Sequence, residues 1–275
     1  MKTRFFLLIF TLSLFVSLHA TGQVVFYADF EPGSKDAIPD AGVNDIKKYK
    51  AENAGTIWAA DDFEGGKLGG KGSMKQTAEG CGISGNTPLP GVTNFTDGIV
   101  QMVFSFGDDD SVGLQFRRKG DDNGYLAVFG YNETASVLFM DLADGCCPSG
   151  QCLDQCGCEN GGKELESVPH GLGGGLDQTN AVPYFGRVEV DGKNVKIWYM
   201  ELAEVDDLFG PSEDLGAPIL EYKNADYTTA GSVGIWHESW GMGRVDSVLV
   251  TNANGFDVDA KGKLTTSWGE VKSSY

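Results

Sequence analysis

The chain is short of basic residues: its 275 residues include 21 Lys and Arg against 39 Asp and Glu, and the formal net charge is −18. A surface this acidic repels nucleic acids and anionic membranes. We therefore exclude nucleic acid as a partner. Acidity keeps a protein soluble outside the cell, and it also supplies carboxylates that can bind calcium, which is plentiful there.

Long apolar runs are also rare. The run from Phe5 to Leu18 follows Lys2 and Arg4 and precedes the small residues 20–22, which is the pattern of a secretory signal. No later stretch approaches the ~20 apolar residues of a membrane-spanning helix. The sequence predicts a signal peptide over residues 1–22 and a secreted protein, extracellular or periplasmic, with no membrane insertion after signal cleavage. A retained N-terminal anchor is the alternative.

Cysteine is absent from most of the chain, and five of the six cysteines lie between residues 146 and 158. An even number of cysteines in an exported chain favours disulfides. The alternative is a zinc site built from Cys152, Cys156 and Cys158, although the paired CxxC spacing of a zinc ribbon is missing. The residues that we assign to disulfides are Cys81, Cys146, Cys147, Cys152, Cys156 and Cys158.

Helical periodicity is almost absent. Apolar and polar residues instead alternate in short runs such as Gly98–Phe106 and Arg244–Thr251, separated by turn residues such as Asp191-Gly192. Many short strands with turns between them predict an all-β fold, a two-sheet antiparallel jelly-roll sandwich.

This sandwich is expected to span residues 23–251. Residues 144–182 are rich in Cys and Gly and break the alternation, which indicates an insertion between strands. Residues 252–275 are expected to form a polar C-terminal tail. The predicted organisation is therefore one domain with a signal peptide, one insertion and a tail.

The stretch from Val112 to Tyr131 predicts a central hairpin of two alternating strands and a polar turn. Leu114 and Phe116 need the core, so Gln115 and Arg117 fall on the opposite face. A guanidinium on that face either meets an acidic partner or awaits the oxygens of a ligand.

The order of three segments, SVGLQFRRKGDDNGYLAVF, GRVEVDGKNVKIWYM and AGSVGIWHESWGMGRVDSVLV, resembles the laminin-G-like or concanavalin A-like jelly rolls of lectins and glucanases. More narrowly, it resembles secreted bacterial modules related to family 66 carbohydrate-binding domains. The segments Asp29-Phe30-Glu31 and 245–250 match the terminal segments that pair in those proteins. The resemblance implies two twisted sheets, a sugar site on the concave face or its rim, and a carbohydrate-binding or adhesive module. Its partner would be a glycan or another extracellular surface component.

Sugar recognition needs aromatic rings for the C–H faces and charged or amide groups for the hydroxyls. Strand alternation places Trp198 opposite Ile197 and Trp236 opposite Ile235, away from the expected core. We expect Trp58 to be structural. The candidate ligand-binding residues are Gln115, Arg117, Tyr125, Trp198, Trp236 and Trp240.

Asp29, Glu31 and Asp246 form a candidate calcium site. Asp29 ends the first predicted strand and Asp246 lies in the last, and these strands neighbour each other in a jelly roll. Calcium takes six to eight oxygen ligands, backbone carbonyls included. Such an ion would have a structural role, and ordinary surface acids are the alternative.

Signatures of catalysis are scarce: the sequence contains no G-x-S-x-G or H-E-x-x-H motif. A retaining glycosidase needs two carboxyl groups ~5–5.5 Å apart, as alternate residues of one strand provide. Glu189 and Asp191 come closest, but Asp191 belongs to a turn. His170 and His237 are isolated in the sequence, and we expect structural or surface roles for them. These observations disfavour an enzyme. The alternatives to a carbohydrate-binding module are a glycan-active hydrolase on the same fold and a structural surface protein without a small ligand.

Overall fold

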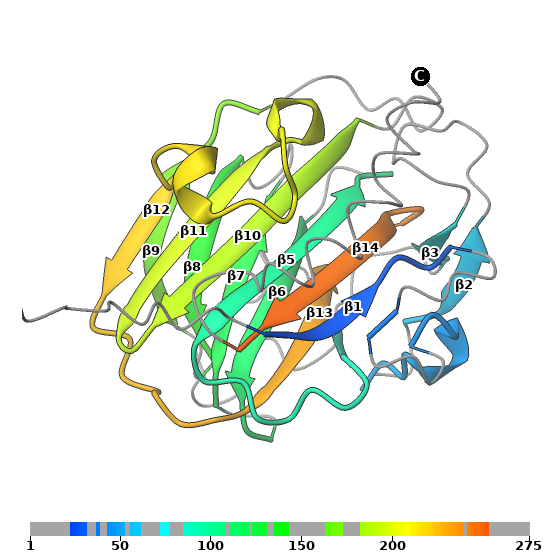
Figure 1. Cartoon of the computed structure of the whole chain (residues 1–275), viewed down its shortest axis with the longest axis horizontal. Helices are drawn as coiled ribbons and strands as arrows, with labels where there is room; N and C mark the ends of the chain where they lie inside the picture. Colours follow the sequence, from blue (N-terminus) through cyan, green and yellow to red (C-terminus); the bar gives the residue numbers. More distant parts are fainter. Residues whose placement is uncertain are drawn as a thin grey trace, which may run out of the picture.

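The computed structural model describes residues 23–31, 37–38, 43–52, 56–61, 72–77, 85–107, 111–120, 123–130, 135–142, 163–172, 182–238 and 241–252. The predicted signal peptide, all six cysteines, Trp240 and the predicted tail beyond residue 252 lie outside these described residues. In the described part, two antiparallel sheets pack face to face (Figure 1). This confirms the predicted sandwich.

The first layer is an eight-stranded sheet, which contains both terminal strands of the described chain. Its strands in spatial order are β12 (Leu220–Lys223), β11 (Asn194–Glu201), β10 (Pro183–Asp191), β5 (Gly98–Ser105), β14 (Arg244–Thr251), β3 (Ser73–Gln76) and β2 (Trp58–Asp61), and β1 (Val24–Ala28) pairs with β14. The β10–β11 hairpin closes at the predicted Asp191-Gly192 turn, with Asp191 opposite Asn194. Within the sandwich, β2 is an edge strand.

The second layer is a six-stranded sheet built around the predicted central hairpin. Its strands in spatial order are β4 (Gly85–Pro88), β13 (Ser232–Glu238), β6 (Ser111–Arg118), β7 (Tyr125–Phe129), β8 (Ser136–Asp141) and β9 (Lys163–Pro169). The two edge strands are β4, which pairs with β13, and β9, which pairs with β8.

The hydrophobic core lies between the sheets, where alternate residues of facing strands point inward. Val100, Met102 and Phe104 of β5 and Leu114 of β6 belong to this core and are fully buried. Phe104 stacks on Phe129 of β7, with ring centroids 5.5 Å apart, and so joins the two layers. Burial of alternate apolar residues from both sheets is the main driving force for this architecture.

The predicted insertion over residues 144–182 contains a strand of the sheet. β9 pairs with β8 in the antiparallel direction, with Val168 opposite Val137 and Glu166 opposite Phe139. Its sequence KELESVP has few apolar residues because, as an edge strand, it is largely exposed. The remainder of the predicted insertion, residues 144–162 and 173–181, lies outside the described residues.

The acidic segment between β11 and β12 contains the short 3-10 turns η2 (Leu202–Glu204) and η3 (Ser212–Leu215) and lies over the outer face of the eight-stranded sheet (Figure 1). Arg187 of β10 is fully buried beneath it. Its guanidinium donates to the carbonyl oxygens of Leu208 at 2.8 Å and Gly210 at 3.0 Å. Burial lowers the pKa of Arg187 to about 10, so the side chain stays charged at neutral pH and ties this segment to the sheet.

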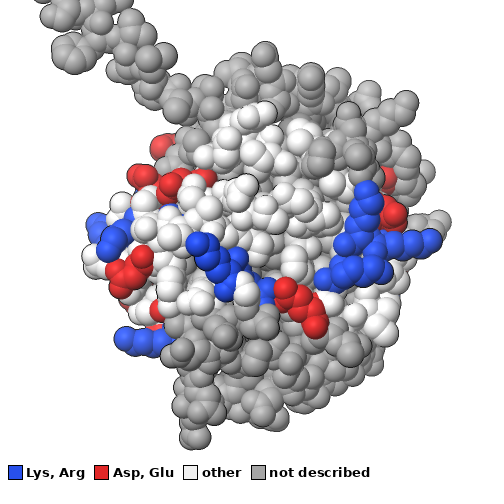
Figure 2. Space-filling model, turned by 90° about the horizontal axis from the view of Figure 1, so that it is seen from below, with Lys and Arg blue, Asp and Glu red and all other residues white. Residues whose placement is uncertain are grey.

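The face of the molecule in Figure 2 carries basic and acidic side chains in separate small groups around an uncharged area. This face therefore carries charges of both signs. Within the part of the chain that the structure describes, no helix has the length and apolar character needed to cross a membrane.

Candidate functional site

Two of the predicted ligand-binding residues share the outer face of the six-stranded sheet. In the β6–β13 ladder Gln115 lies opposite Gly234, and Trp236 lies opposite Gly113. Asn86 of β4 lies opposite Trp236 on the other side. A Cβ atom at Gly113 would collide with the backbone oxygen of Ala127 and the side chain of Leu126, and one at Gly234 would collide with the side chain of Asn86. The strand alternation therefore brings an indole and two amides together on the outer face of the sheet.

These side chains are buried. Trp236 is 2% exposed and Gln115 is 5% exposed. Trp236 belongs to an apolar cluster with Leu126, Val128 and Met140. The side-chain oxygen of Gln115 accepts no hydrogen bond from any described residue. A sugar cannot reach this face in the arrangement that the structure shows.

Arg117 does not line a groove, contrary to the prediction. It has a φ of 51°, and the β6–β13 register shifts between Ser232 and Gly234, directly opposite this position. Such a bulge re-aims a side chain that regular alternation would place on the outer face. The Arg117 side chain is consequently fully buried.

The guanidinium of Arg117 is engaged by protein oxygens on every nitrogen. Nε donates to the carbonyl oxygen of Thr96 at 2.6 Å, and Nη1 to that of Tyr227 at 2.8 Å. Nη2 donates to the carbonyl oxygen of Gly192 at 2.7 Å and to Asp97 Oδ1 at 3.1 Å. Burial lowers the pKa of Arg117, while Asp97 acts in the opposite direction. The residue therefore fastens three loops at one end of the sandwich.

Tyr125 also lies elsewhere than predicted. It is opposite Phe116 in the β6–β7 ladder, which places it on the core face. Its ring packs between Phe116 and Phe139, with centroids 5.7 and 5.1 Å away. Its hydroxyl oxygen accepts from the backbone N–H of Tyr227 at 2.8 Å. Burial raises the pKa of Tyr125 to about 12, and its role in this arrangement is structural.

Trp198 belongs to the other sheet. It is buried on the outer face of β11, where its indole N–H donates to the carbonyl oxygen of Gly216 at 3.0 Å. It thus holds the segment between β11 and β12 and is separated from Trp236 by the whole thickness of the sandwich. Trp240 lies outside the described residues.

The three predicted calcium ligands lie near one another. β1 pairs with β14, with Ala28 opposite Val248, as expected for the terminal strands. Asp246 is buried, and its burial, together with the negative charges of Glu31 and Asp29, raises its pKa well above the usual range. A carboxyl group in such surroundings is stabilised by a proton or by a cation.

The oxygens of this acidic cluster already have partners. Asp29 Oδ1 accepts from Asn44 Nδ2 at 2.9 Å and from the backbone N–H of Glu31 at 3.2 Å. Glu31 Oε1 accepts from the backbone N–H of Gly72 at 3.3 Å. Among the described residues, no group of three or more His, Cys, Asp or Glu side chains is arranged to hold a metal ion. A calcium ion here would need backbone carbonyls, water and a shift of these side chains.

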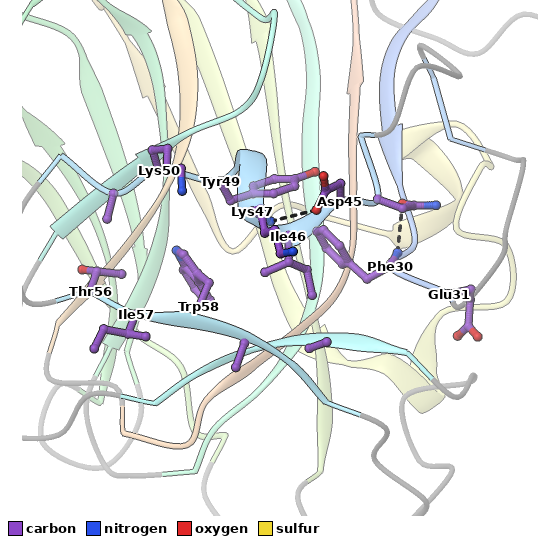
Figure 3. Close-up of a pocket in the computed structure, with 14 residues that line it drawn as sticks. Phe30, Glu31, Asp45, Ile46, Lys47, Tyr49, Lys50, Thr56, Ile57 and Trp58 are labelled. Atoms are coloured by element: carbon purple, nitrogen blue, oxygen red, sulfur yellow. Dashed lines mark hydrogen bonds between the residues drawn. The ribbon is translucent and has the colours of Figure 1, made fainter.

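An open cavity of about 790 Å³ lies between the segment around η1 (Ile46–Lys48) and the edge strand β2 (Figure 3). Its walls come from residues 30–31, 44–47, 49–51 and 56–60. Its volume is within the ~300–1,000 Å³ of small-molecule pockets. The cavity lies where the edges of the two sheets meet, since the backbone N–H of Glu52 bonds to the carbonyl oxygen of Asn86 in β4 at 2.9 Å.

Apolar side chains dominate the floor of this cavity. Ile57 is 57% exposed, the largest exposed fraction of any large apolar side chain in the described residues. Its side chain points to the opposite face of the strand from those of Thr56 and Trp58, which both contact His237. Trp58 and Ile46 are half-buried at the cavity, and Tyr49 and Phe30 pack edge to face with centroids 5.3 Å apart. The indole of Trp58 and the side chain of Ile46 form an apolar surface that a ligand can cover.

Trp58 is held in place by the six-stranded sheet. Its indole N–H donates to Thr87 Oγ1 in β4 at 2.8 Å, and its ring meets that of His237 edge on, with centroids 5.9 Å apart. His237 Nε2 lies 2.7 Å from Thr56 Oγ1. Burial lowers the pKa of His237 to about 3, so its imidazole is neutral above that pH. The wall of the cavity is therefore rigidly braced from behind.

Sequence reasoning missed this cavity. Trp58 was expected to be structural, which its bond to Thr87 bears out, but its neighbours Ile57 and Lys50 were not considered as ligand-binding residues. The only local signal was a short strand with an isoleucine and a tryptophan side by side. The cavity walls come from three separate segments, which only the folded chain brings together.

No protein-family model matches the chain, and no curated protein matches its sequence. Among solved structures, the chain is similar to a Bacillus subtilis protein of unknown function with a galectin-like fold. The TM-score is 0.52 at 13% identity, over 84% of this chain and 97% of that one. This similarity shows a galectin-like jelly roll and confirms the predicted fold; at such identity it shows the fold alone.

Two further solved structures are also similar. The exoplasmic/lumenal domain of VIP36 in its Ca²⁺/Man₃GlcNAc-bound form has a TM-score of 0.47 at 10% identity, over 74% of this chain and 82% of that one. A legume lectin-like domain from Entamoeba histolytica has a TM-score of 0.43 at 11% identity, over 79% and 92% of the two chains.

Proposed function

We propose that this protein is a secreted carbohydrate-binding module that holds a glycan in the open cavity beside β2. The galectin-like fold gives support at the level of the fold. The observation that carries the proposal is the braced, half-buried indole of Trp58 together with the side chain of Ile46, in a cavity of ligand size. Sugar rings have apolar C–H faces that pack on such side chains.

Polar groups at the rim suit the hydroxyl groups of a sugar. Lys50 and Thr56 lie on the side of Trp58 in Figure 3, and Asp45 lies toward Phe30. Ammonium, hydroxyl and carboxylate groups together offer both donors and acceptors. This combination of an apolar floor and a mixed polar rim is typical of sites for small polar ligands.

The outer face of the six-stranded sheet is the second candidate location. The side-chain oxygens of Gln115 and Asn86 there accept no hydrogen bond from the described residues, which favours a polar ligand or a water molecule. Binding at this face would require Trp236 to become exposed. We therefore place the glycan in the open cavity first.

A glycan-active hydrolase is the alternative function. Glu31 and Asp45 are the two carboxylates that line the cavity. Hydrolysis would require both, one as an acid and one as a base or nucleophile. If the protein is a hydrolase, the parent releases products from a bound oligosaccharide, and Glu31→Gln keeps the fold and releases none. If it is a binding module, the parent releases no product either.

Calcium completes the proposal as a structural ion at Asp29, Glu31 and Asp246. The support is the negative charge that these carboxylates share in a buried place between the terminal strands. A cation there would replace the proton that Asp246 otherwise favours. Because Glu31 also lines the cavity, the ion would order the acidic end of that cavity.

A glycan array probed with the purified protein, with and without calcium, tests the function. Ile46→Ser should weaken every positive signal at least tenfold because it removes part of the apolar floor. Val182→Ser is the matched control, since Val182 is 40% exposed and does not line the cavity. If Ile46→Ser binds as the parent does and Gln115→Met does not, the glycan lies on the outer face of the six-stranded sheet. Absence of binding to any glycan supports a structural surface protein.

A further inference from the structure

Charged groups of opposite sign are separated within the cavity. Figure 3 shows Lys50 on the side of Thr56, Ile57 and Trp58, and Glu31 on the far side beyond Phe30. A ligand that spans the floor therefore meets an ammonium group at one end and a carboxylate at the other.

The two acidic side chains at the cavity are already engaged by backbone groups. Asp45 Oδ1 accepts from the N–H of Lys47 at 3.2 Å, where it caps η1, and Glu31 Oε1 accepts from the N–H of Gly72 at 3.3 Å. A carboxylate that accepts backbone hydrogen bonds has part of its charge compensated.

The two lysines at the cavity differ from these acids. Neither Lys47 nor Lys50 forms an ion pair with any of the described residues, whereas Lys193 of the β10–β11 turn pairs with Asp226 at 3.1 Å. Both Lys47 and Lys50 are exposed. In a chain with a net charge of −18, two exposed ammonium groups with no acidic partner among the described residues give the cavity a local positive charge.

We propose that the sugar bound in this cavity carries an anionic group that meets Lys50 at the Trp58 end, an inference that rests on the proposed function of the cavity. The sugar ring packs on Trp58, and its carboxylate or sulfate accepts a charge-assisted hydrogen bond from the ammonium group. The overall negative charge of the protein repels anions at a distance, so binding of an acidic sugar depends on these local cations. The ligand class is acidic glycans, whose charge comes from uronic acids or from sulfate esters.

Calorimetric titration with matched oligosaccharides tests this inference. The probes are oligouronates, the same oligosaccharides after reduction of their carboxyl groups to neutral hydroxymethyl groups, and sulfated derivatives of the reduced forms. At 50 mM salt we expect at least one acidic form to bind ten times or more tighter than its neutral counterpart. Screening should shrink this ratio at 500 mM salt, where the Debye length falls to roughly 4 Å. A higher affinity for the uronate or for the sulfated form identifies which anion the site binds.

The decisive variant is Lys50→Gln, which removes the charge and keeps a polar side chain of similar length. It should bring the acidic and neutral forms to within about twofold of each other and leave binding of the neutral form unchanged. Lys48→Gln is the matched control, because Lys48 lies two residues from Lys50, at the end of η1, and does not line the cavity. If the neutral form binds as tightly as the acidic ones, or if Lys50→Gln keeps the preference, the acidic ligand is wrong while the carbohydrate site stands. If Ile46→Ser also has no effect on binding, the site itself is wrong.

Discussion

The guanidinium of Arg117 lies 3.1 Å from the carboxylate of Asp97, Nη2 to Oδ1, and the same nitrogen donates to the carbonyl oxygen of Gly192 at 2.7 Å. One side chain of β6 thereby joins the loop before β5 to the β10–β11 turn. Asp97 Oδ1 also accepts from the N–H of Gly192 at 2.7 Å, which closes the arrangement. Because Arg117 is buried and Asp97 is about half-exposed, the attraction between them is only partly screened by water.

Removing this guanidinium should destabilise the protein strongly. Arg117→Ala takes a charged donor from Asp97 and from three carbonyl oxygens, and we expect the free energy of unfolding to fall by roughly 3–5 kcal/mol, since each buried acceptor left without its donor costs ~1–3 kcal/mol. Arg117→Lys should recover only part of this loss, because one ammonium group cannot reach all four oxygens. Equilibrium urea unfolding measures both variants.

Lys193→Ala is the control, since its pair with Asp226 is exposed and such pairs contribute ~0–1 kcal/mol. Should Arg117→Ala lose less than about 1 kcal/mol and weaken glycan binding instead, the predicted role of Arg117 in ligand binding would be right after all.

The fold could be predicted from the sequence because strand alternation and turn residues are local features of the sequence. Alternation in β6 and β13 correctly placed Gln115 and Trp236 on one outer face. The same alternation failed at Arg117, where a positive φ at a bulge reverses the direction of the side chain. Tyr125 was misplaced because the hydrophobic pattern of β7 is apolar on both faces, and only the register with Phe116 decides which face meets the core.

The candidate site could not be predicted, because its parts are far apart in the chain. Trp58, Ile46 and Phe30 line one cavity only after β1, η1 and β2 have docked on the sandwich edge. Exposure is likewise a tertiary property: Trp236 and Ile57 both lie next to polar residues in the sequence, yet the first is 2% exposed and the second 57%. Strand periodicity shows which face a side chain occupies and leaves open whether that face is covered.

Calcium should stabilise the protein through Asp246. An ion that binds only the folded state adds about 2.7 kcal/mol at a hundredfold excess over its Kd. Addition of a chelator should therefore lower the melting temperature of the parent, and Asp246→Asn should remove that difference. Differential scanning calorimetry in metal-free buffer, with and without added calcium, measures both effects.

Without calcium, Asp246→Asn should have the opposite effect and stabilise the protein at pH 7. The raised pKa of Asp246 means that the folded state holds a proton that the unfolded state releases above pH ~3.9. The stability from this group is fully present below that pH and is lost as the pH rises through the folded-state pKa. An amide carries no charge, so the variant escapes this loss. Equal melting temperatures with and without chelator in the parent would rule out the calcium site.

The disulfide assignment is testable by thiol titration, although all six cysteines lie outside the described residues. We expect no free thiol in the denatured, unreduced protein and six after reduction. Reduction should make residues 144–182 more sensitive to proteolysis before the sandwich melts, because the cross-links restrain that stretch. Stoichiometric zinc bound to free thiols would show the alternative metal site instead.

His237 should make the protein lose stability in mild acid. It is fully buried, its Nδ1 has no hydrogen-bond partner among the described residues, and burial lowers its pKa to about 3. The unfolded chain takes up the proton near pH ~6.5, so the stability is fully present above that value and falls as the pH falls toward 3. At ~1.4 kcal/mol per pKa unit, the loss at pH 5 relative to pH 8 is about 2 kcal/mol. Urea unfolding at the two pH values should show this loss in the parent and a loss smaller by about that amount in His237→Gln. Thr56→Val removes the 2.7 Å contact with Nε2 and keeps the imidazole, so it should retain the pH dependence. If His237→Gln weakens between pH 8 and pH 5 as much as the parent does, the acid sensitivity comes from the carboxylates and not from this histidine.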